Sequence, residues 1–235
     1  TVITGAVLRT TDTKEADKIL TVLSPQLGKI PVIARGARRK NSRLAAACQL
    51  LAYDELTVYK RGAWYLLDEA ATLELFPGVR RDIVQLSLAS WFAELTEAVC
   101  PEEAPAPGLA ELLLDGLYAL CYLEKDPVLV KAAFQWRLMA LAGFQPFTDN
   151  CAVCGAAEPA APMLDVVHGV VRCGGCKGDG GLSLPLTAAG LAALRHILTA
   201  DGKKLYSFTL EPGALRALDH AGEAFIAAQL ERNFR

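Results

Sequence analysis

Two pairs of closely spaced cysteines constrain this sequence more than any other feature. Cys151 and Cys154 form one CxxC pair, Cys173 and Cys176 form the other, and residues 155–172 separate the two pairs. Two thiolates on one tight turn can both reach a metal ion at ~2.3 Å, and a second such turn completes a four-thiolate shell. The spacing therefore predicts a zinc site made of these four cysteines.

The predicted zinc site is structural. Four thiolates fill the tetrahedral shell and leave no position for water or substrate. A catalytic zinc also needs a general-base carboxylate near a ligand, and the sequence contains no His-x-Glu. We expect the metal to hold together a glycine-rich segment of roughly thirty residues that is too small for a core of its own. A redox function of the two pairs is the alternative, and we expect His168 to be a loop residue rather than a ligand.

A strand followed by a basic loop, residues 28–44, is the second informative stretch. Ile30, Val32 and Ala34 alternate with other positions as in a half-buried strand. The positively charged side chains of the stretch are Lys29, Arg35, Arg38, Arg39, Lys40 and Arg43. No acidic residue lies between Asp17 and Asp54, so we expect this charge to have no local partner. Such a cluster suits a polyanion, of which nucleic-acid phosphate is the commonest, and the alternative is a solvated loop.

The amino-terminal third of the sequence has the pattern of a small β-barrel. Strands are expected at residues 2–11, 18–24, 28–35, 51–59 and 64–75. A short helix is expected at 42–50, and five strands with a helix between the third and fourth is the order of an OB-type Greek-key barrel. In the fifth strand we expect Trp64 on one face and a shared opposite face made of Tyr65, Leu67, Ala71, Leu73 and Leu75.

The remainder of the sequence is predicted to be helical apart from the cysteine segment. Helices are expected at 79–100, 109–124, 127–142, 187–199 and 212–231, with a linker at 101–108. Ile83 is expected on the apolar, buried face of the first helix. Asp126 can cap the third helix and Thr187 the fourth. The third helix is apolar on almost every face, with only a narrow polar stripe at Lys131 and Gln135, so we expect it at the centre of a helical domain. Within the cysteine segment, a strand turned at His168-Gly169 is expected at 166–172. The predicted fold is thus α+β and multidomain. Its expected parts are an OB-type barrel at 1–78, helices at 79–147, a zinc ribbon or knuckle at 148–182 and helices at 183–235.

Charge and motif content exclude several classes of function. Residues 1–80 contain 12 Lys and Arg against 8 Asp and Glu, whereas the rest contains 12 against 18, so the basic character is concentrated at the amino-terminal end. The sequence has no uncharged apolar run of about eighteen residues, so no membrane span is predicted, and no signal peptide is expected. There is no phosphate-binding glycine loop and no nucleophile elbow, and there are three histidines. We therefore expect a cytoplasmic protein that is not an enzyme.

The order of these features resembles the RecO family of DNA repair and recombination mediators. The matching segments are Glu15–Ser24, Gly28–Arg39, Ser42-Arg43 and the two cysteine pairs. The resemblance covers the whole chain. It implies an OB barrel that binds single- and double-stranded DNA and a helical, zinc-bearing domain that helps to bind partners. It also implies that the protein acts with RecR on DNA coated by single-strand DNA-binding protein, anneals complementary strands and promotes RecA loading.

Residues 1–52 contain no aromatic side chain, although OB domains often stack bases on such side chains. Trp64 is the candidate for stacking by its expected face, and packing against the helical part is its alternative role. Arg137 and Arg195 are candidate contacts for an acidic protein tail. Two other functions remain open from the sequence, a protein-interaction scaffold that does not bind DNA and an RNA-directed zinc enzyme.

Overall fold

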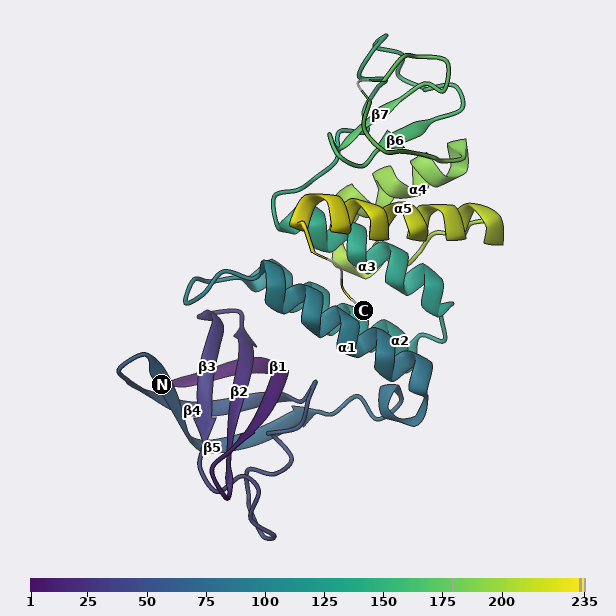
Figure 1. Cartoon of the computed structure of the whole chain (residues 1–235). Coiled ribbons are helices and arrows are strands. Elements are labelled where there is room, and N and C mark those ends of the chain that lie inside the picture. Colours follow the sequence, from purple (N-terminus) through teal and green to yellow (C-terminus); the bar gives the residue numbers. More distant parts are fainter. Residues whose placement is uncertain (179, 233, 235) are drawn as a thin grey trace. The chain divides into compact units, whose positions relative to one another are not determined.

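The chain folds into two compact units, residues 1–124 and 125–235, in a computed structural model that describes residues 1–178, 180–232 and 234 (Figure 1). The first unit holds a β-barrel and two helices. The second holds three helices and the cysteine segment.

The first unit begins with a closed five-stranded barrel. Its strands are β1 (Val2–Thr13), β2 (Asp17–Ser24), β3 (Gly28–Ala34), β4 (Tyr53–Arg61) and β5 (Trp64–Glu74), and their order around the barrel is β1-β2-β3-β5-β4. All pairs are antiparallel except β3 with β5. Ile30, Val32 and Ala34 are fully buried inside it, as the alternation predicted. The OB-type barrel expected from the sequence is confirmed.

A β-bulge changes the inward face of β5. Thr57 of β4 pairs with Glu69, and the next residue of β4 pairs with Leu67, so Asp68 is an extra residue in the ladder. A bulge reverses the alternation beyond it. Ala70 therefore packs against the core, while Ala71 and Leu73, which we expected on the same face as the core residue Tyr65, are exposed. The expectation was wrong because the bulge is a property of the pairing and not of the strand sequence.

The helix expected at 42–50 is absent, and the segment is a series of turns. Ser42 Oγ accepts a hydrogen bond from the Leu44 N–H at 3.3 Å, and Cys48 N donates to Leu44 O at 3.1 Å. The end of the segment bonds to β1 instead, because Leu51 N donates to Val7 O and Val7 N donates to Ala52 O. One turn of helix is unstable by itself, so these tertiary bonds decide the conformation.

Two helices follow the barrel in the first unit, α1 (Ile83–Val99) and α2 (Pro107–Tyr122), preceded by the short 3₁₀ helix η1 (Val79–Arg81). The continuous helix expected from 79 to 100 is therefore interrupted, because Asp82 is extended and caps α1 by accepting the N–H groups of Val84 and Gln85. Ile83, expected to be buried, is 75% exposed. Ile83 is the first residue of α1, whereas the buried residues of this helix lie in its later turns. They are Ala89, Phe92, Ala93, Leu95 and Thr96.

The loop between α1 and α2, expected to be a simple linker, closes the edge of β3. Lys29 N donates to Pro101 O at 3.2 Å, and Glu103 N donates to Lys29 O at 3.2 Å. Only two residues of β3 pair with β5, so the start of β3 needs another partner for its backbone. Gly28 allows this close approach, because a Cβ there would lie 2.0 Å from Ala104 O.

The second unit is built on α3 (Pro127–Leu141), α4 (Ala188–Thr199) and α5 (Pro212–Leu230), with the short helix η2 (Gly202–Lys204) between the last two. Asp126 and Thr187 cap α3 and α4 as expected. Trp136 on α3 is fully buried, and its indole N–H donates to Leu218 O of α5. Gln135, which we expected on a polar stripe, is also buried and donates to the carbonyl of Asp219.

The cysteine segment of the second unit contains a small three-stranded sheet in the order β7-β6-β8. Its strands are β6 (Met163–Asp165), β7 (Val170–Arg172) and β8 (Ser183–Pro185). The strand expected at 166–172 is therefore shorter and begins after the turn that contains His168 and Gly169. No helix in the described part of the chain is long and apolar enough to cross a membrane. The division of the chain at residues 78, 147 and 182 stays a prediction about domain organisation.

Candidate nucleic-acid interface and metal centre

The basic loop, residues 35–43, leaves the end of β3 and carries five exposed cationic side chains. They are Arg35, Arg38, Arg39, Lys40 and Arg43. Gly36, the second residue of the loop, has a φ of 67°, which a residue with a side chain rarely adopts, and its N–H donates to Asp17 Oδ1 at 2.8 Å. Arg38 N also donates to Ala16 O at 3.0 Å. The loop is thus anchored to the turn between β1 and β2, which leaves its cations in solvent.

The expectation that this charge has no local acidic partner was wrong. Arg38 Nε lies 3.2 Å from Asp12 Oδ2, with both side chains exposed in part, and Arg38 Nη1 contacts Glu15 O at 3.5 Å. The acidic residues come from β1 and the turn after it, which strand pairing places beside the loop. An exposed pair of this kind is worth roughly 0–1 kcal/mol, so a phosphate can replace Asp12.

Lys29 does not lie with the basic loop. It is at the opposite end of β3 from Arg35, and six residues of strand span about 20 Å. Its ammonium donates to Glu97 O at 3.0 Å and lies 3.8 Å from Glu102 Oε1. The Lys29 side chain therefore fixes α1 and the loop after it to the barrel.

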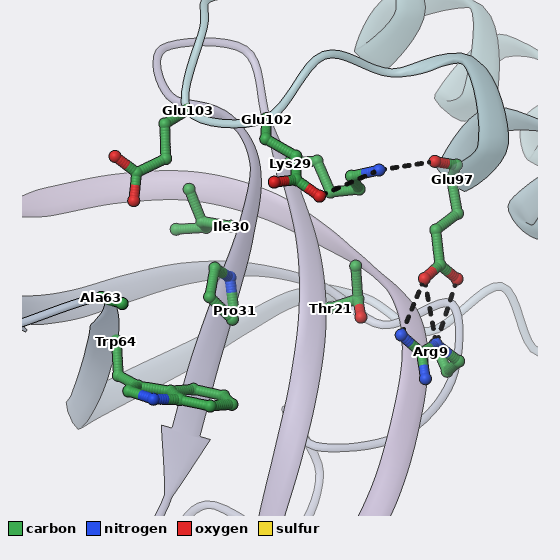
Figure 2. A pocket seen from close by; sticks show the side chains of 10 residues that line it. All are labelled: Arg9, Thr21, Lys29, Ile30, Pro31, Ala63, Trp64, Glu97, Glu102 and Glu103. Atoms are coloured by element: carbon green, nitrogen blue, oxygen red, sulfur yellow. Dashed lines mark hydrogen bonds and ion pairs between the residues drawn. The ribbon is translucent and has the colours of Figure 1, made fainter.

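Trp64 lines a pocket in the first unit, together with Lys29 (Figure 2). The pocket has a volume of about 600 Å³, and Trp64 is 40% exposed at its wall. Its charged lining residues are Arg9, Lys29, Glu97, Glu102 and Glu103. Arg9 is paired with Glu97 at 2.9 Å, and Glu103 is paired with Lys60 at 2.6 Å, so the charges in and around the pocket neutralise one another. None of the five basic-loop cations lines this pocket, so the surroundings of Trp64 differ from those of the loop.

The four predicted cysteine ligands meet at one point of the second unit. Their Sγ atoms all lie within 4.8 Å of one another, with Cys151 to Cys176 at 3.9 Å and Cys154 to Cys173 at 3.8 Å. A tetrahedral ion at ~2.3 Å from each sulfur separates the sulfurs by about 3.8 Å. A disulfide would need about 2.0 Å. The cluster therefore has the spacing of a metal site and could hold one ion.

Backbone hydrogen bonds reach one sulfur of this cluster, that of Cys151. The N–H groups of Cys154 and Cys173 donate to Cys151 Sγ at 3.5 and 3.3 Å. These bonds lower the pKa of Cys151 to about 6, because they favour the thiolate. His168 is outside the cluster, and its Nδ1 contacts Asp165 Oδ2 at 2.9 Å.

Comparison with known proteins identifies the family of this chain. The family model described as Recombination protein O N terminal matches residues 1–76, and the model described as Recombination protein O C terminal matches residues 80–235. The chain belongs to the RecO family.

Several RecO relatives are similar over most of this chain. The DNA repair protein RecO of Acetivibrio thermocellus is 29% identical over 230 residues, which cover 98% of this chain and 92% of the relative. That of Symbiobacterium thermophilum is 29% identical over 234 residues, with the same coverage of each chain. That of Bacillus cereus is 32% identical over 150 residues, 64% of this chain and 60% of the relative.

Lys14 is a candidate interface residue of this RecO protein that sequence reasoning missed. It is exposed in the turn between β1 and β2, against which the basic loop packs. Lys14 is more than twenty residues from the loop along the chain, so the sequence does not show that the two are near each other in space. The pairing of Lys18 with Ala34 in the β2–β3 ladder places the start of β2, and the turn before it, beside the end of β3, where the basic loop begins.

The side chains of Arg137 and Arg195 are already hydrogen-bonded in the structure and are not available to an acidic tail. Arg137 Nη1 donates to Leu198 O at 2.5 Å. Arg195 donates to three backbone carbonyls and to Glu158. Both guanidinium groups are used within the second unit, so the tail contacts inferred from the sequence lose their support.

Proposed function

We propose that this RecO protein binds single- and double-stranded DNA through the basic loop and acts as a recombination mediator without catalytic turnover. In this proposal it works in the cytoplasm with RecR on DNA coated by single-strand DNA-binding protein, anneals complementary strands and promotes RecA loading. The relatives that it resembles are named DNA repair proteins, which supports a role in DNA repair. One structural observation carries the proposal, namely five exposed cations on one anchored loop of an OB-type barrel.

The chemistry of the basic loop suits the sugar-phosphate backbone. Guanidinium groups bind phosphate oxygens with two parallel hydrogen bonds, and four of the five cations are arginines. Contacts of this kind do not depend on base identity, so binding should be independent of sequence. We assign the phosphate contacts to the loop and Lys14 and leave out Lys29, whose ammonium is bound inside the unit.

Trp64 stays a candidate for stacking on a base of single-stranded DNA. It is exposed enough to present one face, although it lies apart from the basic loop. Stacking on an aromatic side chain is worth ~1–3 kcal/mol per base. Trp64→Ala should therefore weaken binding of a single strand and leave duplex binding unchanged, which a fluorescence anisotropy titration can measure.

We further propose that the four cysteines hold a zinc ion with a structural role. When bound, such an ion cross-links the two CxxC turns and offers no open coordination position. The spacing of the sulfurs supports this assignment. The surrounding segment has only short strands and few large buried side chains, so cross-linking should contribute directly to its folding.

The decisive test is binding of the purified protein to single- and double-stranded oligonucleotides over a range of salt concentrations. We expect binding to both, with affinity that falls steeply as salt rises. Failure to bind either oligonucleotide at low salt would refute the proposal and favour a protein-interaction scaffold. Turnover of an RNA or DNA substrate would favour the enzyme alternative. Annealing of complementary strands coated by single-strand DNA-binding protein, with and without RecR, tests the mediator role separately.

A further inference from the structure

Each of the two CxxC turns is held by one arginine. The first knuckle, residues 148–158, contains Cys151 and Cys154, and the second knuckle, residues 173–178, contains Cys173 and Cys176. Arg195 of α4 contacts the first knuckle, and Arg172 of β7 contacts the second. In both cases the acceptors are mainly backbone carbonyls of the knuckle.

Arg195 ties together the two ends of the first knuckle. Its Nε donates to Thr148 O at 2.8 Å, and its Nη2 donates to Asp149 O at 3.0 Å and to Ala157 O at 2.9 Å. The first two acceptors precede the cysteine pair and the third follows it. Nη1 also donates to Glu158 Oε1 at 3.0 Å, but Glu158 is 84% exposed, so this bond adds little. One planar group on a helix thus closes the base of the loop.

Arg172 occupies the inside of the second knuckle. Its Nη1 donates to Cys176 O at 2.7 Å and to Cys173 O at 3.3 Å, so it bonds the carbonyl groups of both ligand residues. Gly178 packs against the same guanidinium, because a Cβ at that position would lie 2.8 Å from Arg172 Nε. The chain therefore turns around this side chain and not around an apolar core.

These contacts bear directly on the shape of the thiol cluster. The sulfurs of the two knuckles approach to 3.8–3.9 Å although only short strands and turns carry them. Hydrogen bonds from a charged donor are about twice as strong as neutral ones, and a guanidinium directs several of them at once. Two positive charges also lie next to a centre that four thiolates and a divalent ion would leave at a charge of about −2.

We propose that Arg172 and Arg195 are positioning residues of the thiol centre, which hold both CxxC turns in the shape that binds a metal and slow its loss. The proposal rests on the structural metal site proposed above. Removal of a group that holds metal ligands in place by hydrogen bonds typically changes metal affinity by about 10–100-fold. Neither arginine contacts a sulfur in the described structure, so each acts through the backbone of its knuckle.

The test uses the full-length chain in four forms besides the wild type. Arg195→Met removes the charge and the hydrogen bonds, and Arg195→Lys keeps the charge but cannot reach all three carbonyls. Arg172→Lys makes the same change in the second knuckle. Arg216→Met is the control, because Arg216 is exposed on α5. Each protein is loaded with zinc or with cobalt, and the transfer of metal to a coloured chelator is followed in time.

We expect metal release to be about 10–100-fold faster in the three knuckle variants and unchanged in the control. The cobalt-loaded variants should keep the charge-transfer bands of four thiolates, because no ligand is removed. Release rates within twofold of the wild type in all three variants would overturn the proposal. A wild-type rate in both lysine variants, with fast release in Arg195→Met, would overturn the role of the hydrogen-bond geometry and leave only that of charge.

A second measurement separates this inference from the zinc proposal. Metal content of the wild type decides whether the site holds zinc at all. The second measurement uses proteins from which a chelator has removed the metal. Cys151 is only 1% exposed in the structure, so the rate at which its thiol is alkylated reports how far the first knuckle opens. Mass spectrometry locates the alkylated cysteine. We expect faster alkylation in both Arg195 variants even without metal. Circular dichroism confirms that each variant is folded, and equal alkylation rates in folded variants would refute the positioning role.

Discussion

The salt dependence of DNA binding tests the candidate interface most directly. Arg39, Lys40 and Arg43 are exposed, and within the described part of the chain none of them takes part in an ion pair. Each phosphate contact contributes about 0.7 to the slope of log affinity against log salt for single strands and about 0.9 for duplexes. Replacing all three with glutamine should therefore flatten the slope by about 2 units for single strands and about 2.7 for duplexes.

Arg38 should behave differently because Asp12 already contacts it. Adding Arg38→Gln should flatten the slope by less than one further unit. Conversely, Asp12→Asn should raise the affinity for DNA at fixed salt, because the Arg38 guanidinium no longer has to leave Asp12 before it binds a phosphate. The pair is worth up to about 1 kcal/mol, so the affinity should rise by at most about fivefold. Fluorescence anisotropy at five or more salt concentrations measures both effects.

A matched control distinguishes local contacts from net charge. Lys125, Lys204 and Arg216 are exposed cations of the second unit, and replacing them with glutamine changes the net charge by the same amount. We expect their triple variant to keep the wild-type slope. An unchanged slope in the triple variant of the basic loop would remove that loop from the DNA surface and refute the reasoning.

Three further predictions concern stability. Burial raises the pKa of Asp54 to about 6, and this carboxylate has no hydrogen-bond partner of good geometry among the described residues. Because its folded-state pKa is above the unfolded value of ~3.9, its contribution to stability is fully present only below that value and is lost as the pH rises through 6. Asp54→Asn should therefore gain up to about 3 kcal/mol at pH 8 but less than about 1 kcal/mol at pH 4 in urea unfolding. Equal pH dependence in both proteins would contradict this. Cys173→Ser should lower the metal content measured by mass spectrometry and the melting temperature, yet keep the wild-type slope of DNA binding against salt; full metal retention would argue against the four-thiolate site. Gly28→Ala should destabilise the chain by more than Gly62→Ala, because both have a positive φ but only the first places a Cβ against the Ala104 carbonyl; equal losses of unfolding free energy in the two variants would show that the close contact is relieved at no cost.

Local patterns in the sequence predicted much of the fold. The alternation of Ile30, Val32 and Ala34 determined the inward face of β3, because neighbouring side chains of a strand point to opposite sides whatever their partners are. Asp126 and Thr187 determined where α3 and α4 begin, because a cap acts on backbone groups within three residues. These effects are complete within a few residues, so sequence reasoning finds them.

Contacts between distant segments account for the errors at the candidate interface. Arg38 was expected to lack an acidic partner because the nearest acidic residues in sequence are Asp17 and Asp54, whereas strand pairing brings Asp12 to it. Lys29 was grouped with the loop because it is six residues from Arg35, but the strand between them is extended and separates them. Distance along the chain is a poor guide to distance in space once strands pair.

The sequence by itself therefore determined the chemistry of each site, and the tertiary structure decided which residues belong to it. Four thiol ligands in two CxxC pairs and a run of arginines define a chemistry through residue identity alone. Which cations share a surface, which strand carries a bulge and which arginine closes a knuckle depend on hydrogen bonds between residues that are tens of positions apart. Such bonds form only when the barrel closes and the helices pack, so no local pattern records them.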